Sequence, residues 1–281
     1  MKTTQPDKKC VDLHVHTIYS DGVFTPAEVV NKAIELGLRA VAITDHDCVD
    51  GVAPCIEYAK GKPLEVIPGV EITASRDDQT EIHILGYFVD HKNEQLLSQL
   101  RQIQENRVQR ITQMVYLLEQ HGVRLDVKKL IASVKLGTIG RPHLAKIMVE
   151  EGAVRNTREA FDLYIGDSKP CYVKHKRIDY RDAIKTIKFS GGVAVLAHPG
   201  AKGIDDYIPE YIAAGLRGIE VFHTKHRPNT SERYSALAKK HGLLITGGSD
   251  CHGGSDDEVL MGKVRVDYDV VEFLKKESEK R

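Results

Sequence analysis

Short apolar runs alternate along most of the chain with stretches in which apolar residues recur every three or four positions. The short runs predict β-strands, and the stretches with the longer period predict amphipathic helices. Repeated strand–helix units predict a parallel sheet, and about seven of them indicate an α/β barrel related to the (β/α)₈ type. The expected strands are Val11–Val15, Ala40–Thr44, Leu64–Ile67, Glu81–Phe88, Val193–Ala197, Gly218–Phe222 and Leu243–Thr246.

Helix start and stop signals lie between several of these strands. Thr25 provides an N-cap and Pro26 a first-turn proline for the first helix, and Gly37 ends it. The helices expected between strands are Ala27–Leu36, Asp179–Phe189, which Gly191-Gly192 closes, and Asn229–His241, which Gly242 closes.

The alternation stops after Asp90, and residues 93–165 contain no convincing strand. Apolar residues at helical spacing from Leu96 to Leu118 predict one long helix. Two shorter helices are expected at His143–Glu151 and Thr157–Tyr164. Because so long a connection needs structure of its own, we expect two domains. They are a barrel domain of residues 1–92 and 166–281 and a helical insertion domain of residues 93–165.

Composition narrows the class of protein. Lys+Arg and Asp+Glu number 40 each among 281 residues, and this balance argues against a protein that coats long nucleic acid. A small anionic substrate remains compatible with it. The five cysteines form no C-x-x-C pair, which suits reduced thiols in a cytoplasm. The start of the chain has no apolar segment of the signal-peptide type, and no apolar run approaches the length of a membrane span, so we expect a cytoplasmic protein without membrane contact.

Histidine and acidic residues gather at the carboxyl ends of the expected strands, where the active groups of parallel barrels lie. His14 and His16 alternate along the first strand, so their side chains project from the same face. Glu71 comes just after the third strand, behind an expected Pro68-Gly69 turn. The other residues at or near strand ends are Asp21, His46, His83, His198, Glu220, His223, His226, Asp250 and His252.

This distribution favours a metal site over histidines that are merely hydrogen-bonded within polar strands. Eight of the thirteen histidines fall near strand ends. The remaining five are expected at the surface or behind the ligands, and they are His91, His121, His143, His175 and His241. Imidazoles and carboxylates without thiolates indicate Zn²⁺, Mn²⁺ or Fe²⁺. There are more ligands than one ion can use, so we expect two or three divalent ions.

Five ordered motifs resemble the PHP (polymerase and histidinol phosphatase) family of metal-dependent phosphoesterases. The resemblance runs through the whole chain except the insertion, and it implies a distorted (β/α)₇ barrel with a trinuclear metal site. The motifs are Asp12-Leu13-His14-Val15-His16-Thr17 with Ser20-Asp21-Gly22, Thr44-Asp45-His46-Asp47, Pro68-Gly69-Val70-Glu71, Ala197-His198-Pro199 and Ser249-Asp250-Cys251-His252.

The same resemblance implies a role for each ligand. A first ion would be held by His14, His16, Glu71 and Asp250, and a second by Glu71, as a bridge, with His83 and His198. The third would be held by Asp21, His46 and His252. Some relatives have a histidine where this chain has Asp21, and the harder carboxylate ligand favours Mn²⁺ or Fe²⁺ over Zn²⁺ there.

Two segments point to one branch of the family. Gly140-Arg141-Pro142-His143 in the insertion and the stretch from Glu220 to His226 resemble enzymes that hydrolyse the 3′-phosphate of nucleoside 3′,5′-bisphosphates. Close relatives of the RNase AM type trim short RNA from the 5′ end. The expected partner is therefore a small phosphorylated nucleotide or a short oligonucleotide.

Clustered divalent ions lower the pKa of a water molecule and neutralise charge on phosphate oxygens, so we assign the nucleophile to the site shared through Glu71. His223 and His226 are candidates to protonate the leaving oxygen and to contact the substrate, with a role in the core as the alternative. Arg141 begins an expected helix, and a guanidinium beside helix N-terminal amides suits the second phosphate of a bisphosphate. The alternative for Arg141 is an ordinary surface arginine.

Three other functions remain open at this point. A phosphatase of histidinol phosphate or another small phosphomonoester is possible within the family. A metal-dependent amidohydrolase also begins with His-x-His on a barrel strand, but it normally bridges its metals through a lysine, and no lysine ends a middle strand here. An inactive PHP scaffold module would be expected to have lost ligands, whereas this chain keeps every expected one.

Overall fold

The computed structural model describes residues 10–77, 80–133, 137–174, 176–201, 204–254 and 259–280. Its strands form one sheet in the order β8-β7-β6-β4-β3-β2-β1-β9, and β5 pairs with the end of β3. The strands are β1 Cys10–Val15, β2 Ala40–Ile43, β3 Glu65–Ser75, β4 Glu81–Tyr87, β5 Ile178–Asp179, β6 Val193–Leu196, β7 Gly218–His223, β8 Leu244–Gly248 and β9 Val266–Asp267.

β1 contacts the segment after β8, and this contact brings the two sides of the sheet together into a nearly closed barrel. The backbone N–H of His16 donates to the carbonyl of Cys251 at 2.9 Å, and Val15 and Cys251 form a parallel bridge. Gly248 at the end of β8 makes this approach possible, because a Cβ there would lie 2.3 Å from the Cβ of His14. The expected barrel is confirmed.

The expectation of a wholly parallel sheet is wrong at β4, which runs antiparallel to both β3 and β6. Only five residues separate β3 from β4 along the chain, and a parallel pair would need a crossover of a dozen or more residues. The expected turn at Pro68-Gly69 is also wrong, because β3 continues through it. Gly69 permits this course, since a Cβ there would meet the carbonyl oxygen of Ile43 at 2.8 Å.

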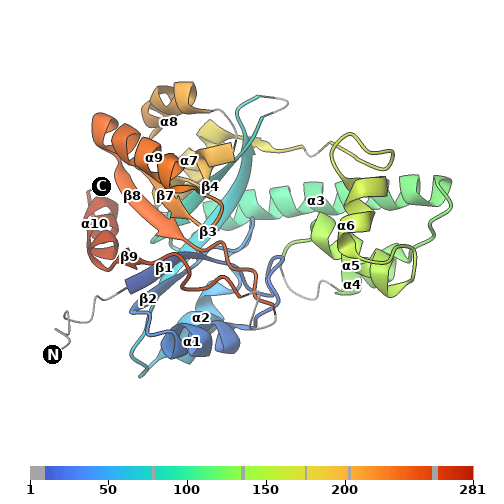
Figure 1. The fold of residues 1–281 in the computed structure, drawn as a ribbon, viewed down its shortest axis with the longest axis horizontal. Helices are drawn as coiled ribbons and strands as arrows, with labels where there is room; N and C mark the ends of the chain where they lie inside the picture. The colour runs from blue at the N-terminus through green and yellow to red at the C-terminus, as the bar shows by residue number, and fades with distance from the viewer. Residues whose placement is uncertain are drawn as a thin grey trace.

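Six α-helices of the described residues accompany the barrel strands (Figure 1). They are α1 Pro26–Glu35, α2 Val52–Ala59, α7 Tyr180–Phe189, α8 Ile208–Ala214, α9 Pro228–His241 and α10 Asp269–Ser278. The predicted start of α1 is confirmed by a capping box in which the backbone N–H of Thr25 donates to Glu28 at 2.7 Å. The sequence patterns missed α2 and α8, which are short and have no side-chain cap at their first turn.

The long helix α3, Glu94–Gln120, leaves the barrel and carries the insertion at its far end (Figure 1). Its first half packs Leu96, Leu100 and Ile103 into the barrel core, whereas Ile111 and Leu118 belong to a second hydrophobic cluster. The other helices of the insertion are α4 Val127–Ser133, α5 Arg141–Glu150, α6 Thr157–Ala160 and the π-helical turn Phe161–Ile165. A separate core supports treating the insertion as a unit, although the domain boundaries stay a prediction.

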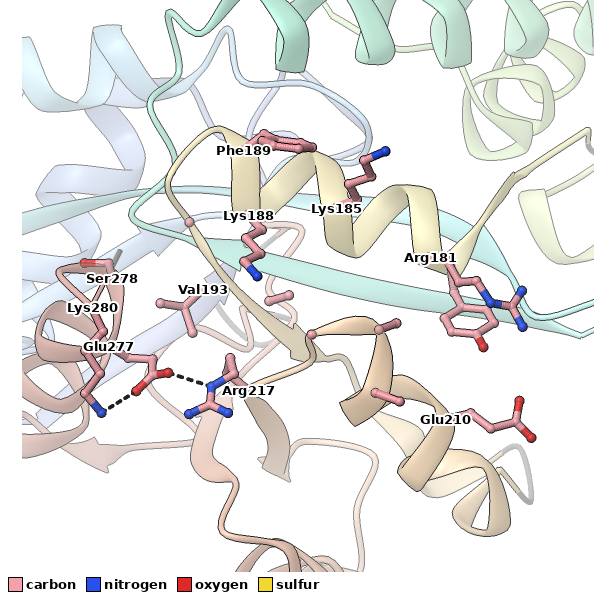
Figure 2. Close-up of a pocket in the computed structure, with 16 residues that line it drawn as sticks. Arg181, Lys185, Lys188, Phe189, Val193, Glu210, Arg217, Glu277, Ser278 and Lys280 are labelled. Carbon is pink, nitrogen blue, oxygen red and sulfur yellow. Dashed lines mark hydrogen bonds and ion pairs between the residues drawn. The ribbon is translucent and has the colours of Figure 1, made fainter.

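A large groove lies at the amino end of the barrel strands, between α7, α8 and the end of α10 (Figure 2). It measures about 1220 Å³, and Val193 at the start of β6 lines it. The predicted ligand His198 lies just after the other end of β6. The groove is therefore separate from the residues expected to bind metal. Within the described ranges no helix has the length and apolar character needed to cross a bilayer.

Candidate metal centre

The predicted ligands come from segments far apart in the chain but lie at one edge of the barrel. β2 pairs with β3 only as far as Pro68, so Glu71 lies beyond the last of these pairs, where it bridges to His46 after β2. Because β4 is antiparallel, the start of this strand reaches the same edge and brings His83 opposite Thr73 of β3. The reversed strand thus delivers a ligand that a parallel strand would have placed elsewhere.

Glu71 is fully buried at the centre of this cluster, and imidazoles surround both of its carboxylate oxygens. Its Oε2 atom lies 3.2 Å from His14 Nε2, 3.3 Å from His16 Nε2 and 3.1 Å from His46 Nδ1. Its Oε1 atom lies 2.8 Å from His83 Nδ1 and 2.9 Å from His198 Nε2. A carboxylate placed between two sets of imidazoles has the geometry of a bridging metal ligand.

Asp250, which follows β8, completes a group that matches the first expected site. Its Oδ1 atom lies 3.2 Å from His16 Nε2 and 3.5 Å from His14 Nε2. One ligand atom from each of these residues and from Glu71 falls within 4.8 Å of the others. This spacing suits four ligands around one cation.

Of the two other expected sites, the group of His16, Asp21, His46 and His252 contains the third, whereas the remaining group of this region joins Glu71 and His83 to His46 and not to the expected His198. Asp21 Oδ1 lies 3.2 Å from His252 Nε2, and the ligand atoms of His16 and His46 complete this group within 4.8 Å. His46 also groups with Glu71 and His83, so it lies between two of the sites. The structure therefore brings together all nine side chains that the sequence nominated as metal ligands, which are His14, His16, Asp21, His46, Glu71, His83, His198, Asp250 and His252.

Several ligand atoms are buried without a hydrogen-bond partner among the described residues. Burying an unpartnered polar atom is unfavourable, and proteins usually avoid it. Here the unpartnered atoms belong to the overlapping ligand groups described above, and divalent cations held by those groups would satisfy their lone pairs. These atoms are His14 Nε2, His16 Nε2, Asp21 Oδ1, His46 Nδ1 and Glu71 Oε2. The residues present thus fit a cluster of divalent ions of the borderline type.

Nearby charges keep the carboxylates of this cluster ionised. Burial alone would raise the pKa of Glu71, but the imidazoles of His46 and His14 outweigh it and hold the pKa well below its usual range. The pKa of Asp250 is likewise lowered against burial, chiefly by His14 and His16. Ionised carboxylates among imidazoles are ready to coordinate a cation.

Glu220 on β7 contacts two of the predicted ligands, and the sequence prediction placed it near the site without giving it a role. It is fully buried, accepts a hydrogen bond from His14 Nδ1 at 2.9 Å and accepts another from the His198 backbone N–H at 2.8 Å. A carboxylate behind a ligating histidine fixes its tautomer and ring orientation. In this protein the Glu220 carboxylate binds Nδ1 of His14, so Nε2 of His14 faces Glu71. The available signal was an acidic residue inside an otherwise apolar strand.

Metal binding is expected to release protons at neutral pH. Against the effect of burial, the carboxylates of Asp250 and Glu71 raise the pKa of His16 to about 10, and Glu71 raises that of His83 to about 9. Both imidazoles are therefore doubly protonated cations in the metal-free protein, and each must lose one proton before it can coordinate a metal ion. Metal affinity should rise with pH between about 7 and 9. Titration calorimetry of the metal-free protein in buffers of different ionisation enthalpy checks this, and identical heats in all buffers would refute it.

The two histidines proposed for proton transfer differ in their surroundings. His223 Nε2 is buried without a hydrogen-bond partner in the described part of the chain and lies 3.4 Å from Asp250 Oδ2. His226 instead donates from Nδ1 to the carbonyl of Val221 at 2.9 Å and accepts the N–H of Gly200 on Nε2 at 3.2 Å. Both nitrogens of His226 are occupied by backbone groups. Its ring holds two loops together and has no free nitrogen for a leaving oxygen.

A second cavity, of about 170 Å³, adjoins the cluster on the side of the insertion. Asp21, His46 and His83 line it from the barrel. Arg141, the predicted phosphate-binding residue, lines it from α5, where it also pairs with Asp167 at 2.7 Å. Two further arginines on α3, Arg107 and Arg110, and His143 of α5 share this lining.

The sequence prediction missed Arg107 and Arg110 because they lie within a stripe that reads as core packing. Of the five histidines assigned elsewhere, His143 lines the cavity and accepts the N–H of Gly140 at 3.1 Å. His175 lies outside the described residues. The other three, which are His91, His121 and His241, are exposed or half-buried.

The chain is similar to known proteins over nearly its whole length. The family model described as PHP domain matches residues 12–167. The 3′,5′-nucleoside bisphosphate phosphatase of Chromobacterium violaceum is 34% identical, over 88% of this chain and 90% of that protein. The 5′-3′ exoribonuclease Rnm of Escherichia coli is also 34% identical, over 86% and 84%.

A solved structure gives the same result for the fold. A protein of Bifidobacterium adolescentis, assigned as a metal-dependent phosphoesterase, superposes with a TM-score of 0.87 at 33% identity and covers 96% of both chains. With a family model that spans more than half of the sequence and relatives this similar, the chain belongs to the PHP domain family.

Proposed function

We propose that this protein is a metal-dependent phosphoesterase that removes the 3′-phosphate from nucleoside 3′,5′-bisphosphates and also trims short 5′-phosphorylated RNA. The observation that carries the proposal is the cluster around Glu71, which opens onto an arginine-lined cavity. The cluster suits hydrolysis of a phosphate ester, and the cavity suits a second anionic group. The two relatives named above act on substrates of this kind, as a bisphosphate phosphatase and an exoribonuclease.

Each part of the cluster has a distinct task in this reaction. Divalent ions held there supply charge neutralisation for the phosphate oxygens and lower the pKa of an attacking water molecule. Glu71 holds the two imidazole sets together through its two oxygens, and Glu220 fixes the ring of His14. His223 is our candidate proton donor to the leaving oxygen, because its Nε2 atom faces the cluster through Asp250. His226 positions the loops beside it.

We propose Mn²⁺ or Fe²⁺ for the group that contains Asp21, since a carboxylate is a harder ligand than imidazole. Zn²⁺ remains suitable where imidazoles dominate, as around His83 and His198. Elemental analysis of protein purified without chelators distinguishes these assignments. Zn²⁺ as the sole bound metal would refute the assignment at Asp21.

An assay of three substrates in the presence of Mn²⁺ tests the proposed function. We expect fast phosphate release from adenosine 3′,5′-bisphosphate, mononucleotide release from a short 5′-phosphorylated RNA, and weak or no turnover of histidinol phosphate. Preferred turnover of histidinol phosphate would favour a small phosphomonoester phosphatase. Release of ammonia or an amine from amide substrates without any phosphatase activity would favour the amidohydrolase alternative, and no turnover at all would favour a scaffold module.

The variant Arg141→Ala tests whether this residue contacts the second phosphate. Loss of a charge-assisted hydrogen bond should lower kcat/KM for the bisphosphate by about tenfold, because such bonds contribute about 1.5 kcal/mol or more. Hydrolysis of a generic aryl phosphate should change little, since it has no second phosphate. Lys146→Ala, an exposed residue of the same helix, is the matched control. Equal losses on both substrates would exclude a specificity role for Arg141.

A further inference from the structure

Another groove, of about 670 Å³, lies beside the end of β7, where His223 joins it to the metal cluster. We propose that this groove holds the nucleotide that follows the hydrolysed phosphate in a short RNA, with the base of this nucleotide stacked on Phe222. The inference deepens the proposed function and rests on it. It gives the enzyme a binding site that RNA occupies and that a nucleoside bisphosphate leaves empty.

The groove adjoins the metal cluster on the side opposite the arginine-lined cavity. Six imidazole rings of the cluster form a closed circuit, in which neighbouring ring centres lie 4.7 to 6.1 Å apart. The circuit runs through His46, His83, His198, His223, His14 and His16 and returns to His46. His46 and His83 line the cavity, whereas His223, across the circuit from His46, lines the groove. A substrate held at the cluster can therefore extend into both.

The chemistry of the substrate decides which part enters the groove. In the proposed reaction the 5′-phosphate lies in the cavity and the reacting phosphate lies at the cluster, so the terminal nucleoside spans the two. In RNA the next nucleotide is joined to the reacting phosphorus through its own 5′-oxygen, whereas a bisphosphate has only a terminal oxygen there. The cavity, at about 170 Å³, has no room for a second nucleotide. The continuing strand therefore leaves the cluster on the side of the groove.

Phe222 of β7 is exposed in this groove because the strand contains a bulge. Glu220 lies opposite Thr246 of β8. Phe222, two residues later, lies opposite Gly247, which is only one residue later, so β7 has an extra residue between the two pairs. In a regular strand Phe222 would share the inward face of the fully buried Glu220, but 41% of its surface is exposed. Gly247 has no side chain to cover the ring, which is therefore available for a base to stack on.

The size and charge of the groove also suit a nucleotide. Its volume falls within the roughly 300–1,000 Å³ of ordinary ligand pockets. Lys263 and Arg265 line it, and Glu232 of α9 is the acidic residue of its lining. Arg265 donates to the carbonyl oxygens of Gly262 at 2.8 Å and Leu36 at 3.2 Å, so neutral groups hold its charge in place. An exposed aromatic ring beside cations is typical of sites that bind single-stranded nucleic acid without sequence preference.

The test compares Phe222→Ala with the wild type on adenosine 3′,5′-bisphosphate and on the 5′-phosphorylated dinucleotide pApA, both with Mn²⁺. The same bond breaks in both: water adds its oxygen to phosphorus, the 3′-oxygen leaves and takes a proton, and AMP is released with either phosphate or a second AMP. We expect kcat/KM for the dinucleotide to fall about tenfold, the order of loss when a stacking aromatic residue is replaced by alanine. The value for the bisphosphate should stay within about twofold, since it has no second base.

Three controls isolate the stacking contact. Phe273→Ala, which removes an exposed phenylalanine of α10, should change neither value. A dinucleotide without the second base should be hydrolysed equally well by the wild type and by Phe222→Ala. Phe222→Leu keeps an apolar side chain but has no ring face, so it should still lose most of the preference for the dinucleotide. This variant keeps the test valid if Phe222→Ala lowers Tm.

Equal losses on both substrates, or no loss on the dinucleotide, would overturn the assignment while leaving the proposed function intact. A dinucleotide with 2-aminopurine as its second base, and with a methylene group in place of the 3′-oxygen that leaves, gives a readout without turnover. Stacking quenches this fluorescence, so the metal-loaded wild type should quench it and Phe222→Ala should not. If the wild type hydrolyses neither substrate but shows this difference, the proposed function fails and the assignment of the groove stands. If quenching is absent or equal as well, both fail.

Discussion

Replacing Glu71 with glutamine is expected to reduce phosphate release by about 10³-fold or more and to lower the bound metal below one ion per chain. Five imidazole nitrogens lie within 3.3 Å of its two oxygens, and a neutral amide can neither balance clustered cations nor bridge them. Residues behind metal ligands typically contribute about 10- to 100-fold, so a ligand shared between sites should contribute more. Activity assays and elemental analysis of the purified variant give the result.

The matched variant is Glu220→Gln, which removes a buried negative charge from the same centre but not from the ligand set. Because Glu220 acts through the ring of His14 and the backbone of His198, we expect an activity loss of only about 10- to 100-fold. Reversal of this order, with Glu220→Gln the more damaging change, would contradict the central position of Glu71.

The substitution Gly248→Ala is expected to destabilise the fold by about 3 kcal/mol or more. A Cβ at this position would lie 2.3 Å from the Cβ of His14 and 2.4 Å from its backbone nitrogen, and neither strand can move away without opening the barrel. This corresponds to a fall in Tm of roughly 6 °C or more at this chain length. Since His14 is displaced by the same change, metal content should fall together with Tm.

Gly122→Ala separates this steric effect from ordinary backbone strain. Gly122 has a φ of +81°, but a Cβ at this position would meet no atom within 4 Å, so only the left-handed conformation opposes alanine. That strain amounts to about 1 kcal/mol. Differential scanning calorimetry of both variants checks the difference, and equal Tm values would mean that β1 and β8 are not closely packed at Gly248.

The predictable part of this fold came from strong local patterns. Every barrel strand expected from an apolar run is present, and the caps at Thr25 and Gly242 mark their helices correctly. The errors at β3 and β4 have separate causes. Pro68-Gly69 resembles a local turn, although β3 continues through it. At β4, apolar periodicity indicates a strand but not its direction, and the reversal of β4 depends on a connection of only five residues and on pairing with β6 far along the chain.

The candidate site also has a part that could be predicted from the sequence and a part that could not. The nine proposed ligands could be nominated because His, Asp and Glu are conspicuous at strand ends. Glu220, Arg107 and Arg110 were assigned no role because their surroundings depend on contacts between segments 60 or more residues apart, such as Arg107 with Asp47, Arg110 with Val173 and Glu220 with His14. His226 is the opposite case, since its position looked catalytic but backbone groups occupy both ring nitrogens.

Anomalous diffraction from crystals of protein purified without chelators tests the central claim most directly, with data collected at the manganese, iron and zinc edges. The account predicts two or three metal peaks around Glu71, each about 2 Å from the imidazole and carboxylate atoms grouped above. Crystals that diffract well yet show no anomalous peak within reach of Glu71, even after soaking in Mn²⁺, would contradict it.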